Sequence, residues 1–500
     1  MDFVRKAGLM QWALSGVLLG SGFIFSFLWP LGIIGIAYFI YLAQQETTYK
    51  KVMIGGFVAW TIKSLGALLW FLSVYPIDWL MFFGDKPQLV LVIFYWATYS
   101  LWLGVGGAIV AVALKYFWTT GMKKLFLALL IPGVWLLGEM VGSVFFSVMT
   151  YGEGASITSA LSFGYVGYLL AQHEWLIWIS RIYGVYALSF AAVLIALCYL
   201  WFGQCLPRTK YYLALVACLV LWGSGYIPFV SLTEDAGEYY SVLSLDTIFS
   251  VLEVQTPEGK EAKVAQLEEA ISTALALDPD YILLPEDTRY FNQSAPTTQE
   301  KVQFQFLHGN PQAIVVGSGR AMVDGKAVLQ AFAYNGLADT VDMSQKRYLV
   351  PQGEFMPYLY TSLLRMVGYG SAVETISKDI SYTVGSLTSQ ANAASSTPGI
   401  LYCFESVSPW GVRQIMKERG EVPFIAHPIS HAWFNEPEIL WENLDTMLRV
   451  QAIWNQQYIV SAGGHVEGKV YTPNGKIRAP ENIAAGEHWT LRQSFIPIRP

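Results

Sequence analysis

Three residues in the second half of this 500-residue chain have side chains that could act together in nucleophilic catalysis. Cys403 ends an apolar, strand-like segment, and it has no nearby cysteine for a structural disulfide, because the other three lie at or before Cys218. A nucleophilic thiol needs a base that takes its proton and a group that stabilises the oxyanion. Glu286 also ends an apolar segment and could be the base if burial raised its pKa. Lys346 could stabilise both the thiolate and the oxyanion.

Each of these residues also has an ordinary structural interpretation. Cys403 could be a small buried apolar residue, and its context favours neither interpretation over the other. A glutamate after a proline, or a lysine before an arginine, is most often a surface residue. Two further carboxylates have spacings that would support the chemistry. Glu354 lies eight residues after Lys346 and could orient it or balance its charge, and Glu405 lies two residues after Cys403.

The segments around these residues predict a layered α/β domain, because strand-like and helix-like patterns alternate from about Asp235 onward. In such sheets the loops at the strand ends form the crevice where reactive residues lie. Helices are predicted at Lys260–Leu277, Trp410–Arg419 and Pro437–Asn455. Strands are predicted at Ser241–Leu245, Tyr281–Leu284, Ala313–Gly317, Ala327–Tyr334, Gly399–Phe404, Pro423–Ala426 and Tyr458–Ala462.

The first half of the chain has the composition of a membrane domain. Hydrophobic residues make up 54% of the whole chain and charged residues only 14%, which is too apolar for a soluble globular protein. The excess lies between Leu9 and Val230, and no cleavable signal peptide is evident before it. Seven spans are predicted: Leu9–Trp29, Leu31–Ala43, Val52–Val74, Leu89–Leu114, Leu125–Val148, Ile182–Phe202 and Tyr212–Val230.

Positively charged residues in the short loops predict the orientation of these spans. Lys and Arg lie before the first predicted span, between the second and third, between the fourth and fifth, and between the sixth and seventh. The N-terminus is therefore expected in the cytoplasm, and an odd number of spans places the second half outside. We expect a membrane domain over residues 1–232, a catalytic domain over 238–490 and a tail over 491–500. The net charge of −6, without a Lys/Arg cluster, argues against a nucleic-acid partner.

Two ionisable residues lie inside the predicted spans. Lys63 and Glu139 would be costly in a membrane unless they are paired or functional. A structural pair, or side chains that reach an interface, is the commoner explanation. The alternative is that Glu139 shapes a headgroup-binding cavity between helices.

Several segments resemble the apolipoprotein N-acyltransferase family, a branch of the nitrilase (carbon–nitrogen hydrolase) superfamily. That superfamily has a Glu, Lys and Cys triad in this chain order, and the likeness extends over nearly the whole chain. The matching segments are Asp278–Glu286, Lys346–Pro357, Tyr402–Glu405 and Ala432–Phe434, together with Trp135–Glu139 and Gly184–Phe190 in the membrane half.

The resemblance implies an αββα sandwich for the outer domain and a two-step acyl transfer without a metal or diffusible cofactor. Glu286 would deprotonate Cys403, which would attack the ester of a membrane phospholipid. Lys346 and the backbone N–H of Phe404 would hold the oxyanion. The amine of a diacylglyceryl-cysteine lipoprotein would then take the acyl chain from the Cys403 thioester. The resemblance places the protein in the inner membrane, with its catalytic domain on the periplasmic side.

The chain also departs from the family pattern. Gln352 stands where the family usually has Phe, Phe404 where it usually has Tyr, and Ser430-His431 where it usually has Asn-Asp. Ser244–Asp246 replaces a Gln-containing segment, and no apolar span follows Arg492, where the family commonly has an anchor helix. These departures keep an alternative open: a membrane-tethered nitrilase-type amidase, or an acyltransferase acting on another amine.

Two loops that follow the triad strands are expected to close over the site, Asp287–Gln299 and Phe355–Gly370. The second loop is too apolar for a solvated connection, so we expect it to form a membrane or partner surface. The alternative is a helix packed against the sheet of the catalytic domain.

Overall fold

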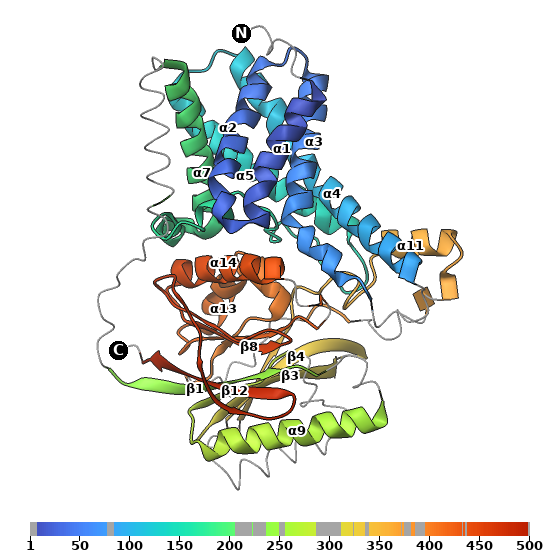
Figure 1. Cartoon of the computed structure of the whole chain (residues 1–500), viewed down its shortest axis with the longest axis vertical. Helices are drawn as coiled ribbons and strands as arrows, with labels where there is room; N and C mark the ends of the chain where they lie inside the picture. Colours follow the sequence, from blue (N-terminus) through green and yellow to red (C-terminus); the bar gives the residue numbers. More distant parts are fainter. Residues whose placement is uncertain are drawn as a thin grey trace.

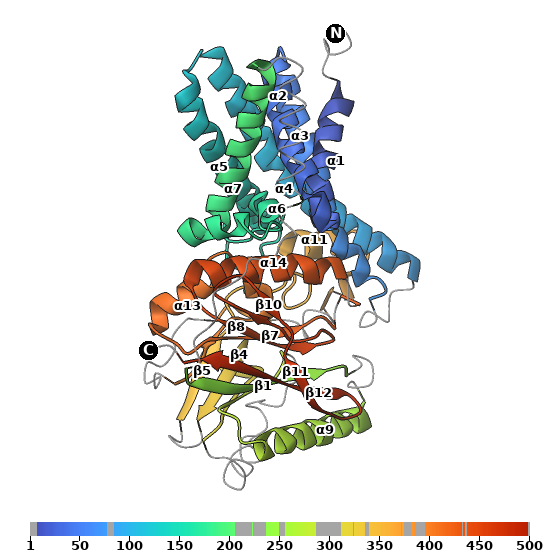
Figure 2. The ribbon, with the colours of Figure 1, turned by 60° about the vertical axis from the view of Figure 1, so that its left-hand side comes forward.

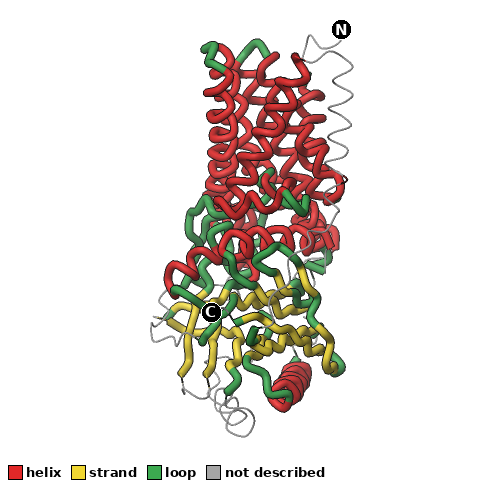
Figure 3. The backbone as a smooth tube through the Cα atoms, turned by 90° about the vertical axis from the view of Figure 1, so that its left-hand side faces the viewer, coloured by secondary structure: helices red, strands yellow, loops and turns green. Residues whose placement is uncertain are grey.

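The computed structural model describes residues 8–77, 85–205, 223, 237–249, 256–286, 312–323, 325–335, 340–371, 373–374, 382–385, 396–432, 434–435 and 438–498. Helices fill one end of the molecule and strands the other (Figure 3). The N-terminal half is a helical bundle, and the C-terminal half lies against one end of it (Figure 1).

The bundle consists of long apolar helices. They are α1 (Leu9–Ile24), α2 (Trp29–Gln45), α3 (Tyr49–Ala67), α4 (Asp85–Thr119), α5 (Lys124–Met149) and α7 (Ser180–Cys205). Four helical stretches in the described part are long and apolar enough to cross a membrane: Ser26–Gln45, Lys86–Thr119, Lys124–Met149 and Leu176–Trp201. Each of the first six predicted spans overlaps one of the bundle helices, and the seventh, Tyr212–Val230, lies outside the described residues. This half has the character of a membrane protein.

Small residues let the bundle helices approach closely. A Cβ atom on Gly56 of α3 would lie 2.4 Å from the carbonyl oxygen of Gly107 in α4. A Cβ atom on Gly16 of α1 would lie equally close to the carbonyl oxygen of Ala59 in α3. Glycine at such crossings brings the backbones into contact, which is a common way for membrane helices to associate.

The connection between α5 and α7 lies at the end of the bundle that faces the C-terminal half, and it contains the short helix α6 (Gly167–Leu170) and the 3₁₀ turn Leu176–Ile179 (Figure 2). Glu139 of α5 fixes this connection, because its Oε1 accepts hydrogen bonds from the backbone N–H of Val166 at 2.7 Å and from Trp135 Nε1 at 3.3 Å. The Lys63 ammonium lies 4.3 Å from the centre of the Trp60 ring. These contacts favour the structural interpretation of Glu139.

The C-terminal half is built on one connected sheet of twelve strands. The main path runs β10-β9-β8-β1-β2-β3-β4-β5, and β6, β7, β11 and β12 pair beside it. The strands are β1 (Tyr239–Thr247), β2 (Tyr281–Leu283), β3 (Ile314–Val323), β4 (Lys326–Asn335), β5 (Thr340–Gln345), β6 (Gly399–Ile400), β7 (Ile425–Ser430), β8 (Ile459–Gly464), β9 (Val470–Tyr471), β10 (Ile477–Arg478), β11 (Glu481–Ala485) and β12 (Trp489–Pro497).

Helices cover both outer faces of this sheet. α9 (Pro257–Ala276) lies on one side, and α13 (Gly411–Arg419) and α14 (Glu438–Asn455) lie on the other (Figure 2). Three clusters of buried apolar residues fill the space between neighbouring layers. One joins α9 to β1, β2 and β3, and another joins α13 and α14 to β7 and β8. The third lies between the strand layers and includes Val242, Leu283, Ala426 and Val460. The predicted fold class, a helical membrane domain with an αββα domain, is confirmed.

The last strand differs from the sequence-based prediction. β12 pairs antiparallel with β1 over nine residues, from Tyr239 opposite Pro497 to Thr247 opposite Trp489. Residues 491–497, which we expected in a tail, therefore belong to the sheet. Leu491 and Ile496 are buried, so this segment adds to the core as well as to the hydrogen-bonded ladder.

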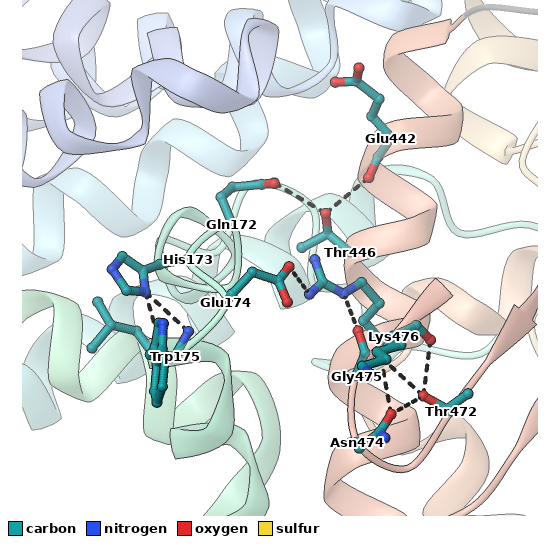
Figure 4. A network of polar contacts seen from close by, with 12 residues as sticks. Gln172, His173, Glu174, Trp175, Glu442, Thr446, Thr472, Asn474, Gly475 and Lys476 are labelled. Atoms are coloured by element: carbon teal, nitrogen blue, oxygen red, sulfur yellow. Dashed lines mark hydrogen bonds and ion pairs between the residues drawn. The ribbon is translucent and has the colours of Figure 1, made fainter. Parts of the chain in front are cut away.

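α14 joins the two halves, since it lies between the sheet and the bundle (Figures 1 and 2). Arg449 of α14 forms an ion pair of 2.6 Å with Glu174 in the connection after α6, and its Nε donates to the carbonyl oxygen of Gly475 at 2.7 Å. Gln172 donates to Thr446 Oγ1 at 3.1 Å in the same network (Figure 4). These contacts fix the bundle to the helix that covers one face of the sheet.

Candidate active site

Cys403 begins a short 3₁₀ turn, Cys403–Val407, directly after β6. The turn is capped by Glu405, whose Oε2 accepts from the backbone N–H of Tyr402 at 3.0 Å and whose Oε1 accepts from the backbone N–H of Arg347 at 2.6 Å. Glu405 therefore ties the cysteine turn to the segment that carries Lys346. The Cys403 thiol lies 3.7 Å from the carbonyl oxygen of Ser430, at the end of β7.

Lys346 is buried between two carboxylates. Its Nζ lies 2.8 Å from Glu286 Oε1 and 2.6 Å from Glu354 Oε1, and its side chain has no exposed surface. Glu354 is itself fixed, because its Oε2 accepts from the backbone N–H of Val350 at 2.8 Å. Glu286 comes just after β2 and Lys346 just after β5, so two separate strand ends supply this cluster.

Burial and the neighbouring charges set the protonation of this cluster. Burial raises the pKa of the Cys403 thiol and the Glu286 carboxylate raises it further, while the Lys346 ammonium opposes both. Burial lowers the pKa of Lys346, but Glu286 and Glu354 outweigh it and hold that pKa above its ordinary value. The site therefore contains a neutral thiol and a charged lysine, so nucleophilic attack by Cys403 would require a base.

The turn that begins at Cys403 lies against the membrane half. Cys403 belongs to the same buried apolar cluster as residues of the bundle helices. The ring of Phe404 packs on Phe163 at 5.9 Å between centroids, and both the backbone N–H and the hydroxyl of Ser162 donate to the carbonyl oxygen of Val407. The site is therefore placed at the junction of the two halves. No group of three or more potential metal ligands occurs among the described residues.

Comparisons with known proteins relate the chain to N-acyltransferases. Residues 15–198 match the model of the apolipoprotein N-acyltransferase N-terminal domain. The apolipoprotein N-acyltransferase of Geobacter metallireducens is 24% identical over 497 residues, which cover 95% of this chain and 87% of that protein.

The membrane half of this chain therefore matches the N-terminal domain of the apolipoprotein N-acyltransferases, and nearly the whole chain is similar in sequence to one of them. Two solved structures also match about half of the chain, each at 12% sequence identity. A CN-hydrolase superfamily protein from Xanthomonas campestris, with an arsenic adduct in its active site, has a TM-score of 0.34, over 52% of this chain and 91% of that one. A glutamine-dependent NAD(+) synthetase from Cytophaga hutchinsonii has a TM-score of 0.32, over 52% of this chain and 43% of that one.

The departures from the acyltransferase pattern have structural explanations at two positions. Gln352 adopts a positive φ of 62°, and its Oε1 accepts a hydrogen bond from the hydroxyl of Tyr99 in α4, which ties the lysine segment to the bundle. His431 is buried, with its ring edge-on to Trp441 at 5.1 Å and to Phe434 at 6.2 Å between centroids. Burial lowers the pKa of His431 to about 4, so its ring is neutral at physiological pH.

Sequence reasoning missed one buried residue beside Cys403. His427 of β7 is fully buried, and its Nδ1 lies 2.9 Å from Ser461 Oγ. Burial lowers the pKa of His427 to about 3, although the backbone carbonyl of Cys403 acts in the opposite direction. The predicted strand Pro423–Ala426 ends one residue before His427. No pattern in the sequence shows that this strand lies behind Cys403.

The apolar segment 355–370 contains the helix α11 (Tyr358–Met366), which packs on the membrane half. Tyr360 lies edge-on to Tyr95 and Tyr99 of α4, with ring centroids 4.6 Å and 6.0 Å apart. Packing on the sheet, the alternative considered above, is not what the structure shows. Met366 and Val367 remain 74% and 67% exposed, so the helix leaves an apolar surface uncovered. The other predicted loop, Asp287–Gln299, lies outside the described residues.

Proposed function

We propose that the chain moves an acyl group from a membrane phospholipid to the N-terminal amine of a diacylglyceryl-cysteine lipoprotein, through a thioester on Cys403. The observation that carries the proposal is the fully buried Lys346 held between Glu286 and Glu354, in electrostatic contact with a buried thiol at the junction with a membrane bundle. The name of the Geobacter relative supports the same activity.

In the first half-reaction, Glu286 takes the thiol proton as Cys403 Sγ attacks the ester carbonyl of the phospholipid. Lys346 and the backbone N–H of Phe404 stabilise the oxyanion. This N–H lies in the first turn of the 3₁₀ segment, where backbone donors have no partner within the turn. When the intermediate collapses, the ester C–O bond breaks and the lysophospholipid alkoxide takes the proton from Glu286. A thioester remains on Cys403.

In the second half-reaction, the neutral amine of the acceptor attacks the thioester carbonyl. Glu286 accepts the proton from the amine, the C–S bond breaks, and the thiolate recovers that proton. The apolar surroundings of Cys403 exclude water and favour aminolysis over hydrolysis. We place the chain in the inner membrane with this site on the periplasmic side, because Lys and Arg gather in alternate loops of the bundle.

The covalent step can be tested with phospholipid that carries a labelled acyl chain. Incubation with the purified protein is expected to give hydroxylamine-sensitive labelling that Cys403→Ala abolishes and that Cys198→Ala, Cys205→Ala and Cys218→Ala retain. Mass spectrometry of a lipoprotein N-terminus then detects the transferred chain. Labelling that persists in Cys403→Ala would disprove the mechanism. A water-soluble amide that is a better substrate than any phospholipid would favour the amidase alternative.

A further inference from the structure

A cavity lies directly beside the catalytic turn, between the two halves of the chain. We call it the side cavity. It is lined by the end of α5 and the segment that follows, and by residues next to Lys346 and Cys403. Lining residues used in the argument below are Ser147, Ser156, Thr158, Arg347, Tyr348 and Phe404. The cavity is not part of the triad, and the two half-reactions described above leave it without a role.

Hydroxyl groups in the side cavity have unused hydrogen-bonding capacity. The Ser147 hydroxyl is already hydrogen-bonded, since it donates to the carbonyl oxygen of Ser156 and accepts from the backbone N–H of Thr158. The Thr158 hydroxyl accepts from the backbone N–H of Ala160 at 2.9 Å, which leaves its own proton free among the described contacts. Within the described part of the chain, the side-chain hydroxyls of Ser156 and Tyr348 also have no hydrogen-bond partner. The cavity therefore offers the hydroxyls of Ser156, Thr158 and Tyr348 to a ligand, on a lining that is otherwise mostly apolar.

The charges around the side cavity are already balanced. Its one basic lining residue, Arg347, lies 3.2 Å from Gln414 Oε1 and 3.1 Å from Glu418 Oε2. The neighbouring Lys346 is held by two carboxylates. A phosphate is bound best by cations and N–H groups that are free to contact it. Hydroxyls without an uncompensated positive charge suit an uncharged, hydrogen-bonding chain better than a phospholipid headgroup.

We propose that the side cavity binds the peptide backbone that follows the lipidated cysteine of the acyl acceptor. This inference rests on the proposed acyl transfer. Phe404 lines the cavity and directly follows Cys403, and adjacent Cα atoms are about 3.8 Å apart. A peptide held there would keep its N-terminal amine close to the thioester, while its alkyl chains remain on the apolar side of the turn.

The test separates the two half-reactions. Tyr348→Phe and Ser156→Ala each remove a hydroxyl with little change of shape. Tyr116→Phe is the matched control, because Tyr116 is exposed near the C-terminal end of α4 and does not line the cavity. Each variant is given labelled phospholipid first, and then either a diacylglyceryl-cysteinyl peptide or diacylglyceryl-cysteine without further residues. Loss of one hydrogen bond is expected to raise the KM for the peptide acceptor about 3- to 10-fold. The KM for the acceptor without a peptide is expected to stay at the wild-type value.

Each other outcome has a distinct meaning. Slower thioester formation in Tyr348→Phe or Ser156→Ala would assign the cavity to the phospholipid headgroup and overturn the inference. An unchanged KM for the peptide acceptor in both variants would overturn it as well, as would an equal rise for both acceptors. Absence of a thioester in the unmodified protein would instead refute the proposed function on which the inference rests.

Discussion

At the scale of single residues, the site combines a neutral thiol with a lysine that is locked between two glutamates. Buried charges are tolerated when they are paired and hydrogen-bonded, and Lys346 meets that condition through Glu286 and Glu354. Glu286 then has two opposing effects on Cys403. Its charge disfavours the thiolate, yet as a base it is the group that can accept the thiol proton during attack.

These two effects of Glu286 predict opposite results for one substitution. Glu286→Gln removes a negative charge, so the pKa of Cys403 falls toward its ordinary value and more thiolate is present at a given pH. Alkylation of Cys403 by a small soluble reagent is therefore expected to shift to lower pH. Thioester formation is expected to slow about 10²–10⁴-fold, because the general base is lost. The pH profile of alkylation and the rate of labelling from phospholipid measure the two effects separately.

Glu354→Gln is the control for this substitution. It removes a second negative charge that also raises the pKa of Cys403, but it leaves Glu286 in place as the base. If both variants slow labelling equally, Glu286 has no special role as a base.

At the scale of elements, α11 is the clearest case of a helix that belongs to one half of the molecule and packs on the other. Tyr360 fixes it to α4, and the face that carries Met366 and Val367 stays exposed. Exposed apolar surface of this kind usually marks a membrane or partner contact. We expect this face to enter the lipid surface and so to present phospholipid to the site.

Charges on this face should weaken the use of phospholipid without unfolding the domain. The double substitution Met366→Asp and Val367→Asp is expected to raise the KM for phospholipid in vesicles about 10-fold or more, because each aspartate would have to leave water. Alkylation of Cys403 should stay at the wild-type rate. Met322→Asp is the matched control, since Met322 is 65% exposed on β3 of the catalytic sheet. Equal effects of the two changes would show that α11 does not contact lipid.

At the scale of the whole molecule, two unlike halves meet over a broad contact that includes α14, the connection after α5 and the catalytic turn. Gly184, with a φ of 58°, allows Trp454 to approach, and a Cβ atom there would lie 2.5 Å from the Trp454 ring. Trp410 donates to the hydroxyl of Tyr186 at 2.9 Å in the same region. The membrane half therefore positions the site as well as anchoring it.

The orientation proposed for the two halves can be measured with single cysteines. In a variant that lacks Cys198, Cys205 and Cys218, Met322→Cys is expected to react with a membrane-impermeant maleimide in cells whose outer membrane has been made permeable. Lys50→Cys, which is also exposed but lies at the start of α3, is expected to react only after lysis. Labelling of Lys50→Cys in intact cells would reverse the proposed topology.

Local sequence patterns predicted the two halves of the molecule and most of their helices and strands. They did not predict the contacts between residues of distant segments. Apolar runs and alternating strands predicted the two halves, and the lone Cys403, with Glu286 and Lys346 at strand ends, directed attention to residues that the structure brings together. No local pattern shows that Ser430 would face the thiol, that Gln352 would bond to Tyr99, or that His427 would lie behind the nucleophile. Each of these contacts joins residues from distant segments, so it depends on how the sheet and the bundle pack. The strand at 489–497 was missed because residues 491–500 were assigned to a tail, and its pairing with β1 joins two segments that are far apart in the sequence.

The pairing of β1 with β12 has a consequence for biosynthesis. β1 is the first described strand after the bundle, and its antiparallel partner is synthesised more than 240 residues later, after all the residues of the proposed triad. Closing so long a loop is entropically unfavourable and slow compared with forming local contacts. While the residues between the two strands are being synthesised, β1 therefore lacks the partner that covers one of its edges. Completion of this part of the sheet would thus wait for β12, and a product terminated before residue 489 would expose an unpaired edge of β1 for proteases to recognise.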